Sequence, residues 1–243
     1  MSLQRVAEPL YEPISVDEAR AHLRVDGDED YGYIGGLIAA ARAHVEDELR
    51  RTLMPTEWQL QLDDWPGRTT ETLLSPLTVI AGVNSQSAYM PLQVASAMDR
   101  MPGRLLELPM APLRSVTSVK YVDANGVEAT FASTNYTVDA WSAPGRIALN
   151  RMAVWPGVQL LPVGGVRVRF VAGYADLLTA ASPQTDITAA RNAVPERYKA
   201  AIKLIVGHLY ENREEVMVGA GIVASQLPLG VHKLLMPTRV FGF

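Results

Sequence analysis

The last third of the chain contains an apolar stripe at helical spacing. In residues 194–216, apolar side chains recur every three or four residues from Tyr198 onward, which is typical of an α-helix with one buried face. Pro195 suits the start of this helix, because its missing N–H group would have no intrahelical partner there. We expect this helix to be the central element of the core. Its predicted packing residues are Tyr198, Ile202, Ile205 and Leu209.

A second stripe with the same spacing lies nearer the N-terminus, in residues 31–51. A shorter helix is predicted over residues 16–23, where Ser15 and Glu18 have the spacing of a capping box. Because an amphipathic helix needs a partner for its apolar face, we expect the two long stripes to pack against each other. The apolar positions of the second stripe are Ile34, Leu37, Ile38, Ala41 and Val45.

Between these helices the period changes to two residues, which is typical of strands. Residues 57–62 alternate in this way, and so does the segment GVRVRFVAGY at 165–174. Asn125-Gly126 stands between two alternating runs and predicts a hairpin with a type I′ turn. Residues 68–103 predict weak strands and a long loop. Further strands are expected at 104–108, 113–122, 127–131, 136–139 and 146–149.

These patterns predict an α+β protein. Its helical bundle core is made of the N-terminal helices and the long C-terminal helix, and an antiparallel β domain is inserted between them. The expected limits are 1–56 for the N-terminal helical part, 57–174 for the inserted β domain, 175–216 for a connecting arm and the central helix, and 217–243 for a C-terminal tail.

The tail concentrates apolar residues after a glycine-rich joint at 219–221, and a short helix is expected at 229–235. Contiguous apolar surface on a globular protein usually marks a partner site, so we expect an interaction segment ordered by a neighbouring subunit or another protein. The alternative is that the tail folds back onto its own core. The predicted interface residues are Leu227, Leu229, Val231, Lys233, Leu234, Leu235, Met236, Arg239, Val240, Phe241 and Phe243.

The composition excludes several classes of protein. The 243-residue chain has 48% hydrophobic and 20% charged residues, as an ordinary globular protein does. It has no cysteine, which excludes disulfides, thiolate zinc sites and a cysteine nucleophile. No apolar run approaches the ~18 residues of a membrane span, and the first residues lack the apolar part of a signal peptide, so we expect no membrane partner. The formal net charge of −4 argues against tight binding to phosphates.

Two sets of polar residues are candidate metal ligands. Asp26, Asp28 and Asp30 have the spacing of the first calcium-loop ligands, but Tyr31 stands where that loop requires glycine. We expect these aspartates to cap the following helix instead. The histidines at 22, 44, 208 and 232 are too far apart in sequence to indicate a zinc site. We therefore predict no metal and no cofactor.

No catalytic residue is predicted either. Asp63 and Asp64 are adjacent, so on a strand they would point to opposite faces and could not converge on one substrate. We expect them to serve a turn, and a small hydrolase using one of them with His208 is a remote alternative. Arg167 and Arg169 share one face of the last strand, which predicts a solvated outer face or a functional polar surface.

The order of the segments is similar to that of a known family. Its most telling pieces are VPERYKAAIKLIVGHLYENRE and PLRSVTSVKYVD, which occur together with ISVDEARAHLRVDGDED and VRVRFVAGY. On these segments the chain resembles the tailed-phage head–tail connector, or adaptor, proteins of the gp8-like branch, which also occur in prophages and gene transfer agents. The likeness spans nearly the whole chain, with residues 68–103 as the main departure.

The resemblance implies a structural protein that forms a homo-oligomeric ring, a dodecamer, beneath the portal and extends the DNA channel toward the tail. The implied partners are the portal protein, which related connectors engage through C-terminal segments, and a downstream tail or stopper protein. Contact with packaged DNA would be passive, which agrees with the acidic balance, because acidic walls hold phosphates weakly. The implied location is the virion neck, after assembly in the host cytoplasm. Another ring-forming virion part, such as a tail terminator or a baseplate-proximal adaptor, is the alternative.

Overall fold

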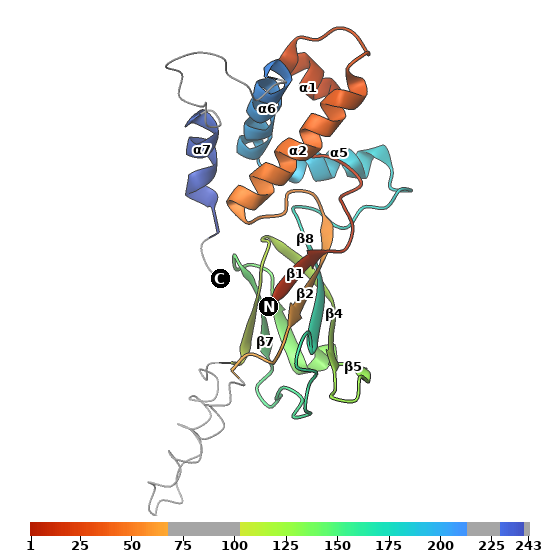
Figure 1. Ribbon diagram of the computed structural model, residues 1–243, viewed down its shortest axis with the longest axis vertical. Helices are drawn as coiled ribbons and strands as arrows, with labels where there is room; N and C mark the ends of the chain where they lie inside the picture. Colours follow the sequence, from red (N-terminus) through yellow and green to blue (C-terminus); the bar gives the residue numbers. More distant parts are fainter. Residues whose placement is uncertain (68–102, 213–228, 241–243) are drawn as a thin grey trace, which may run out of the picture. The chain divides into compact units, whose positions relative to one another are not determined.

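The computed structural model describes residues 1–67, 103–212 and 229–240. The chain divides into two compact units (Figure 1). Unit 1 comprises Met1–Val6, Trp58–Leu108 and Ser115–Phe170, and unit 2 comprises Ala7–Glu57, Pro109–Arg114 and Val171–Phe243. The α-helices belong to unit 2 and most strand residues to unit 1, so the predicted α+β class is confirmed. The weak strands predicted within 68–102 lie outside the described residues.

Unit 2 is a bundle of α-helices (Figure 1). Helix α2 packs most extensively against α6, and α6 also contacts α7 and α1. Helix α7 continues into the 3-10 turn η2 (Met236–Thr238). The α-helices are α1 (Val16–Leu23), α2 (Tyr31–Leu49), α5 (Gln184–Ala193), α6 (Glu196–Glu211) and α7 (Leu229–Leu235).

Helix α1 begins at the predicted capping box. The Glu18 N–H group donates to Ser15 Oγ at 3.0 Å, and the Ser15 N–H group donates to Glu18 Oε2 at 2.9 Å. This reciprocal pair satisfies N–H groups that the start of a helix leaves without an intrahelical acceptor. The sequence prediction is therefore confirmed at this helix.

The apolar stripes of α2 and α6 meet in one buried cluster of unit 2. Leu37 and Leu209 pack against this cluster and are partly buried. Burying a Leu, Ile or Val side chain stabilises a fold by about 1.5–3 kcal/mol, so this cluster is the main source of stability in unit 2. Its fully buried members from the two stripes are Ile34, Ile38, Ala41, Val45, Tyr198, Ile202 and Ile205.

Unit 1 is built from two sheets. The five-stranded sheet has the order β1-β2-β8-β4-β5, and the three-stranded sheet has the order β3-β7-β6. The pairs β1 with β2, β4 with β5, and β7 with both β3 and β6 are antiparallel. The strands are β1 (Ser2–Arg5), β2 (Thr56–Leu62), β3 (Leu105–Leu108), β4 (Leu113–Val122), β5 (Glu128–Thr130), β6 (Tyr136–Asp139), β7 (Gly145–Leu149) and β8 (Val166–Ala172).

Strand β8 shows the alternation that its sequence predicts. Val166, Val168 and Phe170 have no exposed surface. On the other face, Arg167 pairs with Glu128 at 3.3 Å and Arg169 donates to Gln59 at 3.1 Å. Glu128 on β5 also pairs with Lys120 on β4 at 2.6 Å. On the outer face of the sheet, Arg169 therefore links β8 to its neighbour β2, and Arg167 links β8 across β4 to β5.

Aromatic rings fill the core of unit 1. Trp65 and Trp155 stack with ring centroids 4.6 Å apart, and Phe131 lies within 6 Å of both rings, at 5.8 and 5.4 Å. The Trp155 indole N–H donates to the Gly103 carbonyl at 2.7 Å. Stacked and tilted rings at these separations are favourable arrangements of the aromatic quadrupoles.

The hairpin between β4 and β5 is present, but its predicted turn type is wrong. The Gly126 N–H group donates to the Asp123 carbonyl at 3.0 Å, and the Asp123 N–H group donates to the Val127 carbonyl at 3.0 Å. Gly126 has a φ of 83°, whereas Asn125 does not have a positive φ. The loop is therefore a turn followed by a left-handed glycine. Asp123 favours this form because its Oδ1 accepts the N–H groups of Asn125 and Val127.

Two elements differ from the sequence prediction. Strand β1 was not predicted, because its four residues form a strand only by pairing with β2. In this pair Leu3 lies opposite Leu60. The connecting arm predicted within 175–193 contains helix α5, which buries only Ile187 and Ala190 and so has a weak periodic signal. The two compact units also differ from the predicted domains, since residues 1–6 belong to the unit with most strands and residues 109–114 to the unit with the helices. The four predicted domain limits stay a prediction.

The packing of α2 on α6 predicts a large effect of truncating Ile205, which is 2% exposed. Ile205→Ala should lower the free energy of unfolding by about 2–5 kcal/mol, because it leaves a cavity in a packed core. The matched control is Leu204→Ala on the same helix, since Leu204 is 39% exposed and its truncation should change stability by less than about 1 kcal/mol. Urea unfolding followed by helical circular dichroism measures both, and equal midpoints would contradict the assignment.

Candidate interaction site

The C-terminal residues of the described chain fold onto unit 2. Val231, Leu235 and Val240 are 2%, 1% and 6% exposed, and the first two belong to the cluster formed by α2 and α6. The Val240 N–H group donates to the Leu49 carbonyl at the end of α2, at 3.0 Å. The prediction that these three side chains form an outer interface is corrected, because their apolar surface is already buried inside their own unit.

Other residues predicted for this interface remain accessible. Lys233 and Met236 are exposed, and Leu234 and Arg239 are half-buried. Arg239 pairs with Glu48 at 3.4 Å, and the Thr238 carbonyl accepts from Arg51 Nε at 2.9 Å. Of the residues predicted for the interface, Lys233 and Met236 therefore point outward from the folded tail. Leu227, Phe241 and Phe243, and the side chain of Leu229, lie outside the described residues.

A buried ionic network fastens residues 7–13, the N-terminal arm, to helix α2. Arg42, which is 3% exposed, contacts three carboxylates, with Nη1 at 2.7 Å from Glu46 Oε2, Nε at 2.8 Å from Glu12 Oε2 and Nη2 at 3.0 Å from Glu8 Oε2. The other oxygen of Glu46 accepts the Leu53 N–H group at 2.7 Å. The sequence gives no local sign of this network, because Arg42 and its partners are up to 34 residues apart.

The charges of this network are not balanced, because one guanidinium faces three carboxylates. Burial raises the pKa of Glu12, and Arg42 partly offsets that rise. Burial lowers the pKa of Arg42, but the nearby charges of Glu46 and Glu12 outweigh burial and leave the pKa of Arg42 raised. Arg42 is therefore the group that keeps the acidic arm on α2.

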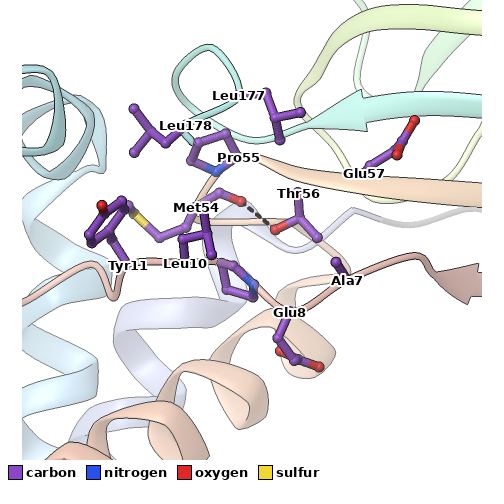
Figure 2. Close-up of a pocket in the computed structure, with 11 residues that line it drawn as sticks. Ala7, Glu8, Leu10, Tyr11, Met54, Pro55, Thr56, Glu57, Leu177 and Leu178 are labelled. Atoms are coloured by element: carbon purple, nitrogen blue, oxygen red, sulfur yellow. Dashed lines mark hydrogen bonds between the residues drawn. The ribbon is translucent and has the colours of Figure 1, made fainter. Parts of the chain in front are cut away.

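The N-terminal arm also forms one wall of an apolar pocket of about 210 Å³ in unit 2 (Figure 2). Figure 2 shows Leu177 and Leu178 on one side of Pro55, and Leu10 and Tyr11 on the other. Exposed apolar side chains form the opening, since Leu10 and Leu177 are 59% and 50% exposed.

The polar side chains that line this pocket either form a hydrogen bond within the chain or lie at the rim of the pocket. The Thr56 hydroxyl donates to the Met54 carbonyl at 2.9 Å. The carboxylates of Glu8 and Glu57 point away from Pro55 (Figure 2). Such a site fits an apolar group of a partner better than it fits a charged small molecule.

Two of the three aspartates that the sequence offers for calcium make other contacts. Asp28 pairs with Arg20 at 2.9 Å, and Asp30 accepts the Tyr210 hydroxyl at 2.5 Å. Asp30 precedes α2 but makes no side-chain cap bond, so the capping prediction is wrong for this residue. Its φ of −92° and ψ of 8° depart from the extended backbone that directs a capping side chain onto the first turn. The described residues contain no group of three or more potential metal ligands.

The two aspartates that the sequence offers for hydrolysis accept backbone N–H groups. Asp63 Oδ1 accepts the Gly164 N–H group at 2.9 Å, and this bond is the main reason that the pKa of Asp63 is lowered. Asp64 Oδ1 accepts the Trp65 N–H group at 2.8 Å. Both aspartates belong to unit 1, while His208 belongs to unit 2. Within the described ranges, no helix has the length and apolar character needed to cross a membrane.

Residues 13–75 match the family of phage gp6-like head-tail connector proteins. This match confirms the predicted resemblance to phage head–tail connectors, although the matched family is described as gp6-like and the resemblance was to the gp8-like branch. No curated protein matches the chain.

Three solved structures share the fold. One chain from the neck of an empty gene transfer agent particle, computed with C6 symmetry, has a TM-score of 0.65 and 23% identity. A chain from the virion of the native particle has a TM-score of 0.64 and 22% identity, and one from the native neck computed with C12 symmetry has 0.61 and 24%. Each comparison covers 100% of this chain and 97% of the other.

The ionic network predicts that Arg42→Met destabilises unit 2. Removing one partner of a buried ion pair typically costs about 3–5 kcal/mol, because uncompensated charge stays buried. Arg197→Met is the matched control, since Arg197 is exposed on α6. Chemical unfolding of both variants measures the difference, and a loss no larger than that of the control would contradict the role of Arg42.

The same variant should show a distinct pH dependence. Because the pKa of Glu12 is raised in the folded state, folding favours its protonated carboxyl. Glu12 therefore contributes stability that is fully present at pH values below its ordinary pKa of 4.5. This contribution is lost as the pH rises through the pKa that Glu12 has in the folded state. Without Arg42, whose charge lowers the pKa of Glu12, the pKa of Glu12 in the folded state should rise further. The stability penalty of Arg42→Met should therefore shrink as the pH falls from about 7 to about 5. Unfolding curves at several pH values test this, and a constant penalty would argue against it.

Proposed function

We propose that this chain is a structural head–tail connector that forms a ring in the neck of a phage-like particle. The observation that carries the proposal is the family match over residues 13–75. The whole-chain likeness to proteins of gene transfer agent necks supports it, because it extends the agreement to the fold of both units. The protein acts through its surfaces in this proposal, and it has no catalytic role.

The ring would hold the chain between a portal protein and a downstream tail or stopper protein. The related neck structures were computed with C6 and C12 symmetry, which supports a ring and is compatible with twelve subunits. The net charge of −4 suits a channel wall, because acidic surfaces do not retain DNA phosphates. Assembly would take place in the host cytoplasm, before the finished ring becomes part of the virion.

One experiment tests the proposal directly. The purified protein is imaged by electron microscopy alone and after mixing with the portal protein encoded in the same gene cluster. We expect rings with a central hole that sit coaxially on the portal. Protein that stays monomeric in both samples, or that binds the portal without a common axis, would overturn the proposal.

The accessible part of the folded tail predicts a portal-binding defect. Lys233 and Met236 are exposed at the end of α7, so combining Lys233→Glu with Met236→Ser should weaken portal binding at least about fivefold. The fold should be retained, because neither side chain is buried. The control combines Arg197→Glu with Met152→Ser at exposed positions elsewhere. Co-sedimentation with portal measures both variants, and equal binding would contradict a role for this surface.

A further inference from the structure

An exposed tryptophan is the most prominent apolar group on the surface of unit 1. The chain has four tryptophans, and Trp58, Trp65 and Trp155 are buried or half-buried. Trp141, in the loop between β6 and β7, is 99% exposed. A tryptophan side chain has one of the largest apolar surfaces available for burial, and tryptophan is enriched among the residues that dominate protein interfaces.

The Trp141 loop is held in one conformation by Asp139. The carboxylate accepts the Trp141 N–H group at 3.1 Å, the Ser142 N–H group at 3.2 Å and the Ser142 hydroxyl at 2.7 Å. Arg146, opposite Asp139 on β7, donates to the same carboxylate at 2.6 Å. A loop that is already ordered loses little conformational entropy on binding. The indole is therefore presented as a preorganised knob.

The pocket of unit 2 has the size and chemistry to receive such a knob. A cavity of about 150 Å³ admits a benzene ring, and the pocket of about 210 Å³ has room for the larger indole. Its walls include Leu10, Pro55 and Leu177, and its acidic groups lie at the rim. The charge of Asp139 is neutralised by Arg146, so the approaching loop adds no uncompensated negative charge.

The symmetry of a ring determines which molecule supplies the knob. Identical subunits close into a ring larger than a dimer only through head-to-tail contacts, in which two different patches of the same chain meet. Among the described residues, the most exposed large apolar side chain, Trp141, belongs to unit 1, and the apolar pocket beside Pro55 belongs to unit 2. We propose that Trp141 of each subunit inserts into the pocket formed by Leu10, Pro55 and Leu177 of the next subunit. This inference rests on the proposed ring.

Cross-linking tests the contact directly, because the chain has no native cysteine. One protein carries Trp141→Cys and a second carries Leu177→Cys. The mixture is treated with a short bis-maleimide under conditions of ring assembly, at a protein concentration raised about 30-fold to offset the weaker association of the variant without the indole. We expect covalent dimers from the mixture and none from either protein alone. Replacing Trp141→Cys by Met152→Cys, at a side chain that is 91% exposed, should abolish the dimers. Dimers from Trp141→Cys alone would show that two Trp141 loops meet, and would overturn the proposal.

Fluorescence gives a second measurement on the intact chain. Emission of the wild-type protein should shift to shorter wavelength on ring assembly as Trp141 becomes buried, and Trp141→Phe should lack this shift. Trp141→Ala should weaken subunit association about 30-fold, the effect expected for an interface hot spot. Leu177→Asp should act similarly, whereas Leu204→Asp, at another exposed leucine of unit 2, should not. Circular dichroism verifies that each variant is folded.

The outcomes separate this inference from the proposed function. If wild-type rings form and Trp141→Ala rings form equally well, the Trp141 contact is overturned and the connector function stands. If Trp141→Ala forms rings that no longer bind portal, the knob contacts the portal and the subunit contact is overturned. If the wild-type protein forms no ring with or without portal, the connector proposal itself fails, and this inference fails with it.

Discussion

The burial of helix α2 is the constraint on which unit 2 depends. One face of α2 packs its apolar stripe against α6. Another presents Arg42 to Glu8 and Glu12 of the N-terminal arm. The end of the helix binds the C-terminal residues, through the Leu49 carbonyl and the Glu48 carboxylate. Segments from both ends of the chain are therefore ordered by one helix, and a change in its position would affect all of them.

The sequence predicts those parts of the fold that depend on local pattern. The stripes of α2 and α6 and the alternation of β8 follow from periodicity, because one buried face imposes its period on the sequence. The capping box of α1 is equally local, since Ser15 and Glu18 are three residues apart. The α7 helix was also predicted, because prolines at 228 and 237 bound a short apolar run.

The parts that were missed depend on contacts between distant residues. Nothing near Arg42 in the sequence indicates that Glu8 and Glu12 will share it, and nothing in residues 2–5 indicates pairing with β2. The tail is the most instructive case, because its apolar residues fit both an outer interface and a folded-back segment. The structure assigns Val231, Leu235 and Val240 to the second role, and composition alone could not distinguish the two. The pocket beside Pro55 likewise arises from three separate segments.

The edges of the five-stranded sheet affect whether copies of this chain can lie close together without aggregating. Exposed strand edges can pair with other sheets and start aggregation, and short or charged edge strands prevent this. Here the outermost strands, β1 and β5, have four and three residues. Glu128 on β5 is held by Lys120 and Arg167, so a foreign strand joining that edge would have to bury or displace charged groups. The proposed ring would hold identical sheets close together, and these short edges favour discrete assembly over fibre growth.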